Sequence, residues 1–467
     1  MNPIRKLFEQ TAIYGIGHMV GRILNFALVP LYVSQFSPEE YGKVTDLYAL
    51  VVFAMVFLTY GMETAFFRYI QDADEPNAVF RTGMRSLIAT TAVFLAVVIL
   101  GLEPIARVLQ YTDHPEYLLF FAGILAFDAL SALPLALLRA KGKAGRFAWI
   151  KLSNIGINVG LNLVLILGFK GWGIEAIFIA NLVASGWMFL LLLPEWKGLR
   201  GPGDPILWKK MIQYGWPILF AGLAGAVNEV ADRQFLKYLL PDDEAFRNLG
   251  IYGANYKLAI FITLFIQAFR YGAEPFFFAQ AKGDKQIYAR VMDVFVAFVA
   301  LIYLGLRLFL NELGSWFIPN EVYREGLHIV PILLLANVGL GLLTNLSVWY
   351  KVTDRTRAGA TIALFGALIT IGLNLWWIPL WGYTGAAWAT LVSYGSMTLL
   401  SYFWGRKHFA IPYHWIKNLG SIAAVVVVAE GASRMEAPAP LNTLIFIIFA
   451  GVFVFMEKSH LQSVRNE

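Results

Sequence analysis

Long apolar segments separated by short polar ones run through the whole sequence, and this alternation restricts the fold more than any other feature. A helix needs about 20 mainly apolar residues to cross the hydrocarbon core of a membrane. Fourteen segments of the 467-residue chain fit that description: residues 11–33, 44–69, 84–102, 116–138, 148–168, 172–194, 211–231, 250–275, 291–310, 327–350, 359–380, 384–404, 418–432 and 440–456. We therefore expect an all-α integral membrane protein with about 14 transmembrane helices.

The composition excludes most soluble classes of protein. Hydrophobic residues make up 58% of the chain and charged residues only 15%, whereas about 25% of the residues of an ordinary soluble domain are charged. This argues against a soluble enzyme, a disulfide-rich secreted module or a disordered scaffold. The sequence has no cysteine, and its six histidines lack the spacing of metal ligands. We expect no disulfide, no metal site and no cofactor.

Membrane-embedded glycosyltransferases and polymerases usually need sizeable loops outside the membrane. The longest predicted loop here is about Asp232–Leu249, and no GxxxxGK[ST] phosphate-binding loop is present. We therefore expect a protein that is not an enzyme.

Lysine and arginine test the number and the direction of the spans. If the N-terminus is cytoplasmic, 25 Lys and Arg side chains fall in cytoplasmic loops and tails. Seven fall on the opposite side: Lys43, Arg107, Lys170, Lys237, Arg247, Arg324 and Arg434. Cytoplasmic loops of membrane proteins carry such an excess of basic residues. We expect both termini in the cytoplasm, and the net charge of +6 then reflects orientation and not nucleic-acid binding.

A repeat relates the two halves of the sequence. Residues 60–67 read YGMETAFF, and residues 271–278, 211 positions further on, read YGAEPFFF. Each copy places a glutamate inside an apolar segment, Glu63 in the first and Glu274 in the second. We expect these two glutamates to tie neighbouring helices together or to form part of a gate.

A second match supports the repeat. Asn162 recurs as Asn374 at a shift of 212, and the same shift carries the basic turn at Arg139 onto Lys351. Six spans separate the copies, so both halves have the same orientation in the membrane. We expect two pseudo-symmetric six-helix bundles, a cytoplasmic linker, and two extra transmembrane helices with a cytoplasmic tail. Their ranges are 1–198 and 211–405 for the bundles, 199–210 for the linker and 406–467 for the last part.

Charged residues within the apolar segments are candidates for function, because a charge at the centre of a membrane costs about 2.5–3.5 kcal/mol on insertion scales. Arg22 and Asn25 lie on one face of the first span. Arg22 is a candidate anchor for an anionic head group, and the alternative is a structural ion pair, for example with Glu63. Asp128, in the middle of the fourth span, is a candidate for ion or proton coupling.

The second half carries a different set of charges. Gln267, Arg270 and Glu274 share one face of the eighth span, and Lys257 lies further along it. This pattern suits a substrate that bears several negative charges. Asp232 and Arg233 end the seventh span, and they form either a solvated helix end or an outer gate.

Three stretches of the sequence together resemble the bacterial polysaccharide transporter family. They are YGIGHMVGR at residues 14–22, FSPEEYG at 36–42 and DRQFL at 232–236. The members of this family are lipid-linked oligosaccharide (O-antigen type) flippases of the multidrug/oligosaccharidyl-lipid/polysaccharide exporter superfamily, and the resemblance covers essentially the whole chain.

The resemblance implies two bundles around a central cavity and transport by alternating access. The implied substrate is an undecaprenyl-diphosphate-linked oligosaccharide, moved from the cytoplasmic to the periplasmic leaflet of the bacterial inner membrane for cell-surface polysaccharide such as lipopolysaccharide O-antigen. Arg22, Lys257 and Arg270 would face the cavity, and Asp232-Arg233 matches an acid–arginine pair of the family. Further implied partners are the bilayer, a counter-ion (H⁺ or Na⁺) and polysaccharide assembly enzymes.

Related functions remain open at this point. They are a lipid II flippase, a drug/ion antiporter of the same superfamily and, outside transport, a membrane-embedded polysaccharide polymerase. In lipid II flippases the last two helices form a groove for the lipid tail, a role that residues 418–456 would then share.

Overall fold

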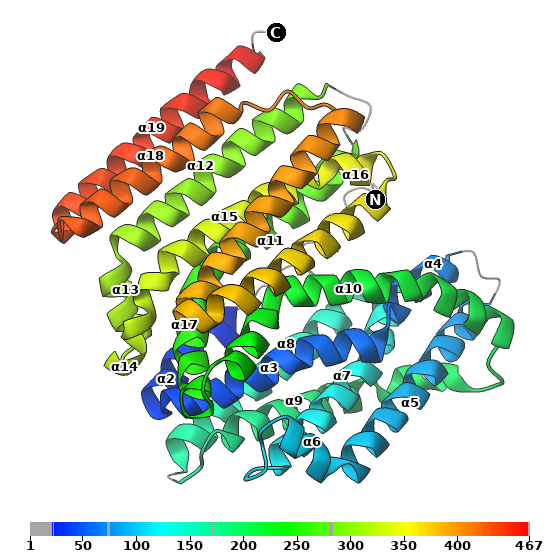
Figure 1. Cartoon of the computed structure of the whole chain (residues 1–467). Helices are drawn as coiled ribbons and strands as arrows, with labels where there is room; N and C mark the ends of the chain where they lie inside the picture. Colours follow the sequence, from blue (N-terminus) through cyan, green and yellow to red (C-terminus); the bar gives the residue numbers. More distant parts are fainter. Residues whose placement is uncertain (1–20, 22, 72–74, 170, 280–283, 466–467) are drawn as a thin grey trace. The chain divides into compact units, whose positions relative to one another are not determined.

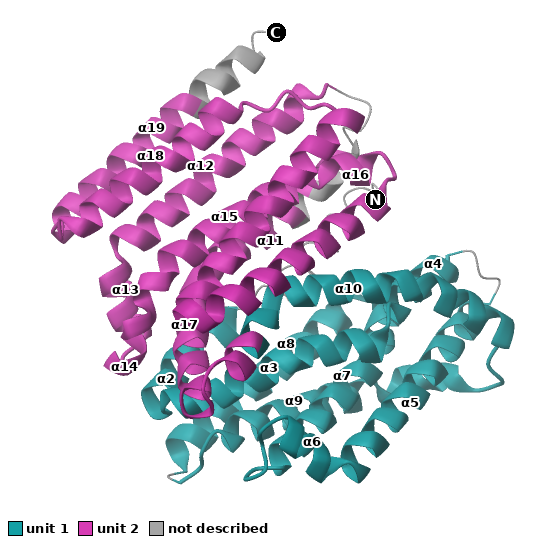
Figure 2. Cartoon of the chain, in the orientation of Figure 1, with its two compact units in different colours: residues 1–234 teal, residues 235–467 magenta. Residues whose placement is uncertain are grey.

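The computed structural model describes residues 21, 23–71, 75–169, 171–279 and 284–465, and these residues contain α-helices, short 3₁₀ and π turns and no β-strand (Figure 1). Eleven helices in this part of the chain are long and apolar enough to cross a membrane, and a shorter apolar helix covers Ile23–Gln35. The expected all-α membrane fold is confirmed. The chain divides into two compact units, residues 1–234 and 235–467 (Figure 2). The four ranges expected for the bundles, linker and tail remain a prediction.

Unit 1 contains the helices up to most of α10. They are α2 (Val29–Gln35), α3 (Pro38–Thr59), α4 (Met62–Ile70), α5 (Pro76–Leu100), α6 (Leu102–Val108), α7 (Glu116–Ala140), α8 (Ala144–Leu163), α9 (Glu175–Leu192) and α10 (Pro205–Leu239). A π-helical turn, Val164–Gly168, extends α8, and a 3₁₀ segment, Leu193–Leu199, follows α9. Helix α7 lies at the centre, since it packs against α3, α4, α5, α8 and α9.

Unit 2 contains the remaining helices. They are α11 (Asp242–Ala279), α12 (Gln286–Leu308), α13 (Leu310–Phe317), α14 (Glu321–Arg324), α15 (Val330–Leu346), α16 (Val348–Val352), α17 (Thr356–His408), α18 (Trp415–Arg434) and α19 (Ala439–Arg465). A 3₁₀ turn, Glu325–Ile329, joins α14 to α15. Helix α15 packs against α11, α12 and α17, and the last two helices pack against α12.

Local sequence explains several helix boundaries. The FSPEEYG stretch at 36–42 starts α3 with a capping box: the Ser37 hydroxyl accepts a hydrogen bond from the Glu40 amide, and the Glu40 carboxylate accepts one from the Ser37 amide. Pro38 occupies the first helical turn, where its missing amide hydrogen costs nothing. In α17, non-helical Gly382 (φ 54°, ψ −137°) separates two helical segments that correspond to the expected spans 359–380 and 384–404.

One expected segment is wrong in detail. The predicted loop Asp232–Leu249 is largely helical, because α10 continues to Leu239 and α11 begins at Asp242. Hydrogen bonds and buried packing keep this charged stretch helical, which apolar periodicity alone does not reveal. Of the first expected span, residues 11–20 and 22 lie outside the described residues.

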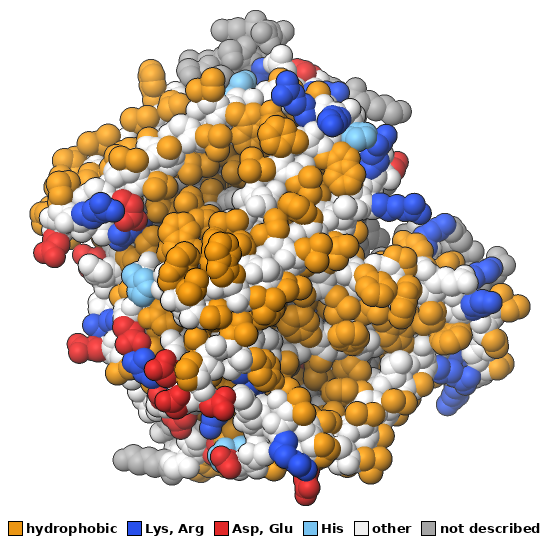
Figure 3. Space-filling view, viewed as in Figure 1, with side chains coloured by type: hydrophobic (Ala, Val, Ile, Leu, Met, Phe, Trp, Pro, Cys, Tyr) orange, Lys and Arg blue, Asp and Glu red, His pale blue; other side chains and the backbone are white. Residues whose placement is uncertain are grey.

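The surface of unit 2 agrees with a membrane setting. Hydrophobic side chains cover most of its visible face, Lys and Arg gather around α16, and Asp and Glu gather around α14 at the other end (Figure 3). Many large apolar side chains are exposed, among them Leu399, Phe403 and Ile448. A soluble protein rarely exposes apolar surface on this scale, so these faces are suited to contact with lipid.

Candidate functional site

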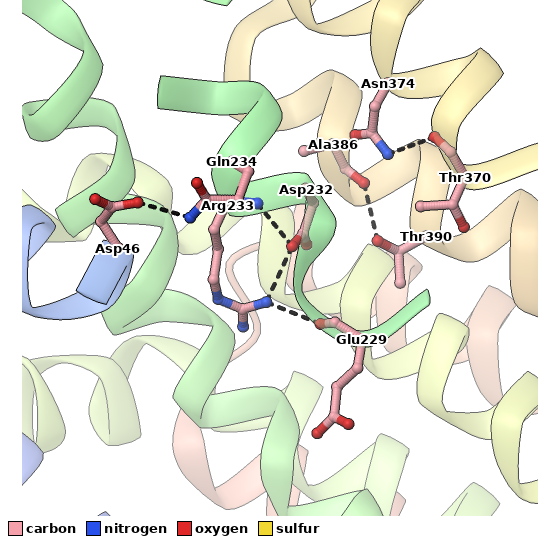
Figure 4. A network of polar contacts seen from close by, with 9 residues as sticks. All are labelled: Asp46, Glu229, Asp232, Arg233, Gln234, Thr370, Asn374, Ala386 and Thr390. Carbon is pink, nitrogen blue, oxygen red and sulfur yellow. Dashed lines mark hydrogen bonds and ion pairs between the residues drawn. The ribbon is translucent and has the colours of Figure 1, made fainter. Parts of the chain in front are cut away.

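The first candidate region is a buried polar network at the end of unit 1 (Figure 4). The Arg233 guanidinium donates to Asp232 Oδ1 (3.0 Å) and to the Glu229 carbonyl oxygen (2.8 Å). Gln234 Nε2 donates to Asp46 Oδ1 at 2.7 Å, and the Tyr111 hydroxyl donates to Asp46 Oδ2 at 2.8 Å. The network fastens α10 to α3 and to the segment after α6.

This environment bears on the two alternatives for Asp232 and Arg233. Asp232 is 3% exposed and Arg233 is 9% exposed, so neither belongs to a solvated helix end. A hydrogen-bonded pair buried beside Asp46 has the rigidity that a gate residue would need, and a gating role for the pair remains a proposal.

Glu63 forms an ion pair with Arg139, and this pair joins α4 to the end of α7. The Arg139 guanidinium also lies over the Phe67 ring, 4.9 Å from its centroid. The partner of Glu63 in the described residues is therefore Arg139. Arg22, the sequence-based candidate for that role, lies outside the described residues, and Asn25 is exposed on its helix. Glu274 lies in α11, but its side chain is also outside the described part.

Asp128 shows no evident partner in the sequence. In the structure, Ser185 of α9 and Lys151 of α8 are near enough to act on its carboxyl group electrostatically. The sequence did not single out Lys151, because it is one of five basic residues in the predicted cytoplasmic loop 139–151. Basic residues are common in such loops, so each of them has an ordinary explanation.

The second candidate region is a small pocket of about 10 Å³ in unit 2, between α11, α15 and α16. Two cations and two hydroxyl groups line it, together with apolar side chains: Arg270, Lys351, Thr344, Ser347, Phe269, Ala273, Phe277, Val348 and Val352. Arginine and lysine beside hydroxyl donors are the side chains that bind phosphate oxygens in proteins. The arrangement can bind an anion in a largely apolar setting.

The structure does not bring all the sequence-based candidates of unit 2 into this pocket. Lys257 lies 13 residues before Arg270 on the same continuous helix, a separation of about 20 Å along its axis. Gln267 is partly buried one turn before Arg270 and does not line the pocket. Lys351, which the sequence places in a loop, does line it. The repeat in the sequence could have identified Lys351 as a candidate, since it matches Lys351 to Arg139.

Charged pairs that sequence reasoning missed hold α18 against α12. Asp293, 2% exposed, accepts hydrogen bonds from Lys417 (3.3 Å) and Asn418 (2.9 Å) and lies 2.8 Å from His414 Nδ1. The other end of the contact is a two-bond pair between Arg307 and Glu430, at 2.6 and 2.8 Å. The sequence feature that could have indicated these pairs is Asp293, an acid inside the apolar segment 291–310. These pairs serve packing, because they link helices of one unit.

Asn374, the repeat partner of Asn162, carries a buried oxygen without a hydrogen-bond partner in the described residues. Its Nδ2 donates to the Thr370 carbonyl at 2.7 Å, and the Thr390 hydroxyl donates to the Ala386 carbonyl at 3.0 Å (Figure 4). Asn374 differs in this respect from Asn162, whose Oδ1 accepts a hydrogen bond from the Tyr32 hydroxyl at 2.9 Å.

The sequence is similar to a known protein family and to a known protein. A protein-family model described as polysaccharide biosynthesis protein matches residues 7–273. The chain is 20% identical over 327 residues to protein 1 of the Lsg locus of Haemophilus influenzae, an alignment that covers 68% of this chain and 76% of that protein.

Two solved structures share the fold. The lipid II flippase MurJ in an inward closed conformation superposes with a TM-score of 0.78 at 15% identity, over 97% of this chain and 99% of that one. An inward-facing multidrug resistance MATE family transporter of the MOP superfamily gives 0.69 at 13% identity, over 83% and 94%. At these identities the likeness establishes the fold.

Proposed function

Because the chain belongs to the polysaccharide biosynthesis protein family, we propose that it is a transporter that flips a polyprenyl-diphosphate-linked oligosaccharide across a membrane by alternating access. The movement runs from the cytoplasmic to the periplasmic leaflet of the bacterial inner membrane, both termini are cytoplasmic, and the product serves cell-surface polysaccharide assembly. The protein catalyses no covalent step in this proposal.

The single observation that carries the proposal is the pocket lined by Arg270 and Lys351. A diphosphate cannot enter hydrocarbon without replacing its water, because an unpaired buried charge costs many kcal/mol. Two cations with the hydroxyl groups of Thr344 and Ser347 supply such replacement partners. The polyprenyl tail stays in the lipid throughout.

The remaining site residues have assigned roles in the proposal. Substrate contacts come from Arg22, Asn25, Lys257, Gln267 and Arg270, and coupling or gating from Glu63, Asp128, Asp232, Arg233 and Glu274. A counter-ion, H⁺ or Na⁺, or the membrane potential drives movement uphill. The potential contributes about 2.3 kcal/mol per charge per 100 mV. Assembly enzymes that build and consume the lipid-linked sugar are the partners.

The test uses purified protein in liposomes that contain a labelled polyprenyl-diphosphate oligosaccharide. We expect the head group to become accessible on the far leaflet without any change in the mass of the lipid. Arg270→Ala lowers the rate at least about tenfold, the effect of losing a charge-assisted hydrogen bond. The matched control is Thr59→Ala at the equivalent repeat position, where the hydroxyl bonds only within its own helix. Equal rates for both variants would remove Arg270 from the site, and a lipid with longer glycans would indicate an enzyme.

The fold match to MurJ along nearly the whole chain favours one second candidate, flipping of lipid II. The same liposomes with labelled lipid II distinguish the two substrates. Faster movement of lipid II than of the oligosaccharide lipid would select the second candidate.

A further inference from the structure

Exposed cations gather at one end of unit 2, around α16 (Figure 3). Two contacts show that three helix ends meet there. Lys285, just before α12, lies over the Phe409 ring that follows α17, 4.3 Å from its centroid, and Trp349 of α16 stacks on His408 of α17. Among the described residues, these ends expose five cations and two acids: Lys285, Arg355, Arg357, Arg406, Lys407, Asp284 and Asp354. This surface therefore carries an excess of positive charge.

A small pocket of about 10 Å³ lies at this surface, between α16, the end of α17 and the connection to α18. Arg406, Tyr402 and Tyr413 are among the side chains that line it. In the described part of the chain, the Arg406 guanidinium and the two tyrosine hydroxyl groups make no hydrogen bond or ion pair. Trp415, whose ring centroid is 4.8 Å from that of Tyr402, has a buried indole N–H that also lacks a partner there. Several hydrogen-bond donors thus stand together, and Arg406 adds a positive charge.

An apolar stripe on α17 leads to Arg406. Leu399, Phe403 and Arg406 are spaced i, i+4 and i+7, so they lie on one face of the helix. Leu399 is 59% exposed and Phe403 58%, and the exposed side chains of Trp388 and Val392 continue the stripe away from Arg406. From Leu399 to Arg406 the helix rises about 10 Å. The exposed face therefore changes from apolar to cationic within about two helical turns.

A phospholipid with an anionic head group has the same arrangement of apolar and charged parts. Arginine binds phosphate oxygens through parallel hydrogen bonds, and basic pockets between transmembrane helices bind anionic head groups. A soluble anion would use the cations but not the apolar stripe. A zwitterionic lipid would place its own positive group among these cations. The stripe and the cations together therefore favour an anionic lipid.

Orientation in the membrane explains why basic residues are frequent at this end. It does not require a cation in line with an exposed apolar stripe, nor donors without partners beside that cation. These two observations distinguish Arg406 from Arg357, which is exposed near the start of α17 but does not line the pocket.

We propose that Arg406, with the hydroxyl groups of Tyr402 and Tyr413, binds the phosphate of an anionic phospholipid whose acyl chains lie along Leu399 and Phe403. The lipid comes from the leaflet at this end of unit 2, and the protein holds it without transporting it. The inference needs only the membrane fold of unit 2, so it is independent of the proposed function.

The experiment titrates the purified full chain in detergent with phosphatidylglycerol and, separately, with phosphatidylcholine. Native mass spectrometry counts the lipids bound to each protein molecule and gives the dissociation constant of the first one. We expect the wild type to bind phosphatidylglycerol more tightly than phosphatidylcholine. Arg406→Gln weakens the first phosphatidylglycerol about fivefold, the effect of one basic side chain beside an anionic lipid, and leaves phosphatidylcholine unchanged.

The matched control is Arg357→Gln, which removes an exposed arginine from the same surface and leaves the binding of phosphatidylglycerol as in the wild type. A double variant, Tyr402→Phe with Tyr413→Phe, weakens that binding at least about twofold through the loss of two hydroxyl groups. This variant carries the test if Arg406→Gln does not fold. Inorganic phosphate at the same concentration as the lipid does not displace it, because the phosphate ion makes no contact with the apolar stripe.

Four results would overturn the inference. They are equal affinity of the wild type for the two lipids, equal losses in Arg406→Gln and Arg357→Gln, unchanged binding in the double tyrosine variant, and displacement of the lipid by inorganic phosphate. Flipping in liposomes is measured separately on the same preparations. A wild type that binds phosphatidylglycerol as expected but moves no lipid-linked sugar contradicts the proposed function and supports the inference.

Discussion

The two copies of the repeated Tyr-Gly-x-Glu stretch have different backbone conformations. In unit 1, Tyr60 (φ 33°) and Gly61 (φ 73°) are left-handed, and they separate α3 from α4. In unit 2, α11 continues through the matching residues Tyr271 and Gly272. Similar local sequences therefore break a helix in one half and continue it in the other. Tertiary neighbours decide the outcome, because the backbone of Gly215 approaches Gly61 closely.

The charges at repeated positions differ in the same way. In unit 1, Arg139 pairs with Glu63 and links two helices. In unit 2, the matching Lys351 lines a pocket with Arg270, whose own counterpart is the neutral Thr59. The comparison shows that matching positions of a duplicated frame can differ in role: one joins two helices, and the other lines a pocket to which the proposed function assigns anion binding.

The largest expected effect contrasts Lys351 with Arg139. Lys351→Gln lowers flipping about tenfold, because a cation is lost from the pocket. Arg139→Gln mainly lowers thermal stability, because Glu63 is left without its partner. Flipping assays and thermal unfolding in detergent on the same preparations measure both. If the two variants lose transport equally at equal stability, the assignment of different tasks to the two copies is wrong.

The next effect concerns the ion pair between Arg307 of α12 and Glu430 of α18. Glu430→Ala lowers the free energy of unfolding by about 2–3 kcal/mol, because it leaves the Arg307 guanidinium, 13% exposed, without its carboxylate. The doubly reversed variant, Arg307→Glu with Glu430→Arg, recovers most of the loss. Thermal unfolding checks this, and a double variant as unstable as the single one would contradict the pairing.

A smaller effect is expected at the repeated glycines. Gly61→Ala costs about 1–2 kcal/mol, because the residue has a positive φ and a new Cβ would meet the Gly215 carbonyl oxygen at 2.9 Å. Gly272→Ala adds up to about 1 kcal/mol of stability through helix propensity. Denaturant unfolding measures both changes. If the two variants change the free energy of unfolding by the same amount and in the same direction, the backbone difference between the two copies is contradicted.

The smallest effect separates the two repeated asparagines. Asn162 Oδ1 accepts a bond from the Tyr32 hydroxyl at 2.9 Å, whereas Asn374 Oδ1 has no such partner in the described residues. Asn162→Ala therefore destabilises the protein by about 1 kcal/mol more than Asn374→Ala does. Denaturant unfolding measures both variants, alone and combined with Tyr32→Phe. If the Tyr32 hydroxyl causes the difference in destabilisation, the difference disappears when Tyr32→Phe is present. A difference that persists would show that the hydroxyl is not the cause.

Much of the fold follows from the sequence because the membrane imposes a simple rule. A chain with long apolar runs must satisfy its backbone hydrogen bonds internally, so it forms helices. The helical class and the span count of about 14 therefore come from local composition, and the capping box at Ser37 marks a helix start. The loop at Asp232–Leu249 was misjudged because polar residues stay helical when a network such as Asp46–Gln234 buries them.

The candidate site was predictable only in part. Arg270, Asp128 and Glu63 could be predicted as candidates because each is a charged residue within an apolar segment, where a charge is costly. Such a residue can be recognised from its neighbours in the sequence alone. Their partners are not local: Arg139 lies 76 residues from Glu63, and Glu430 lies 123 residues from Arg307.

The sequence by itself determined a helical membrane protein with repeated halves and a few charges in its spans. The tertiary structure decided which distant residues lie beside those charges: Arg139 pairs with Glu63, and Lys351 lines a pocket with Arg270. The physical reason is the length of sequence on which each property depends. Whether a segment forms a membrane-spanning helix depends on about 20 consecutive residues. The energy of a charge depends on the side chains packed beside it, and these come from distant parts of the sequence.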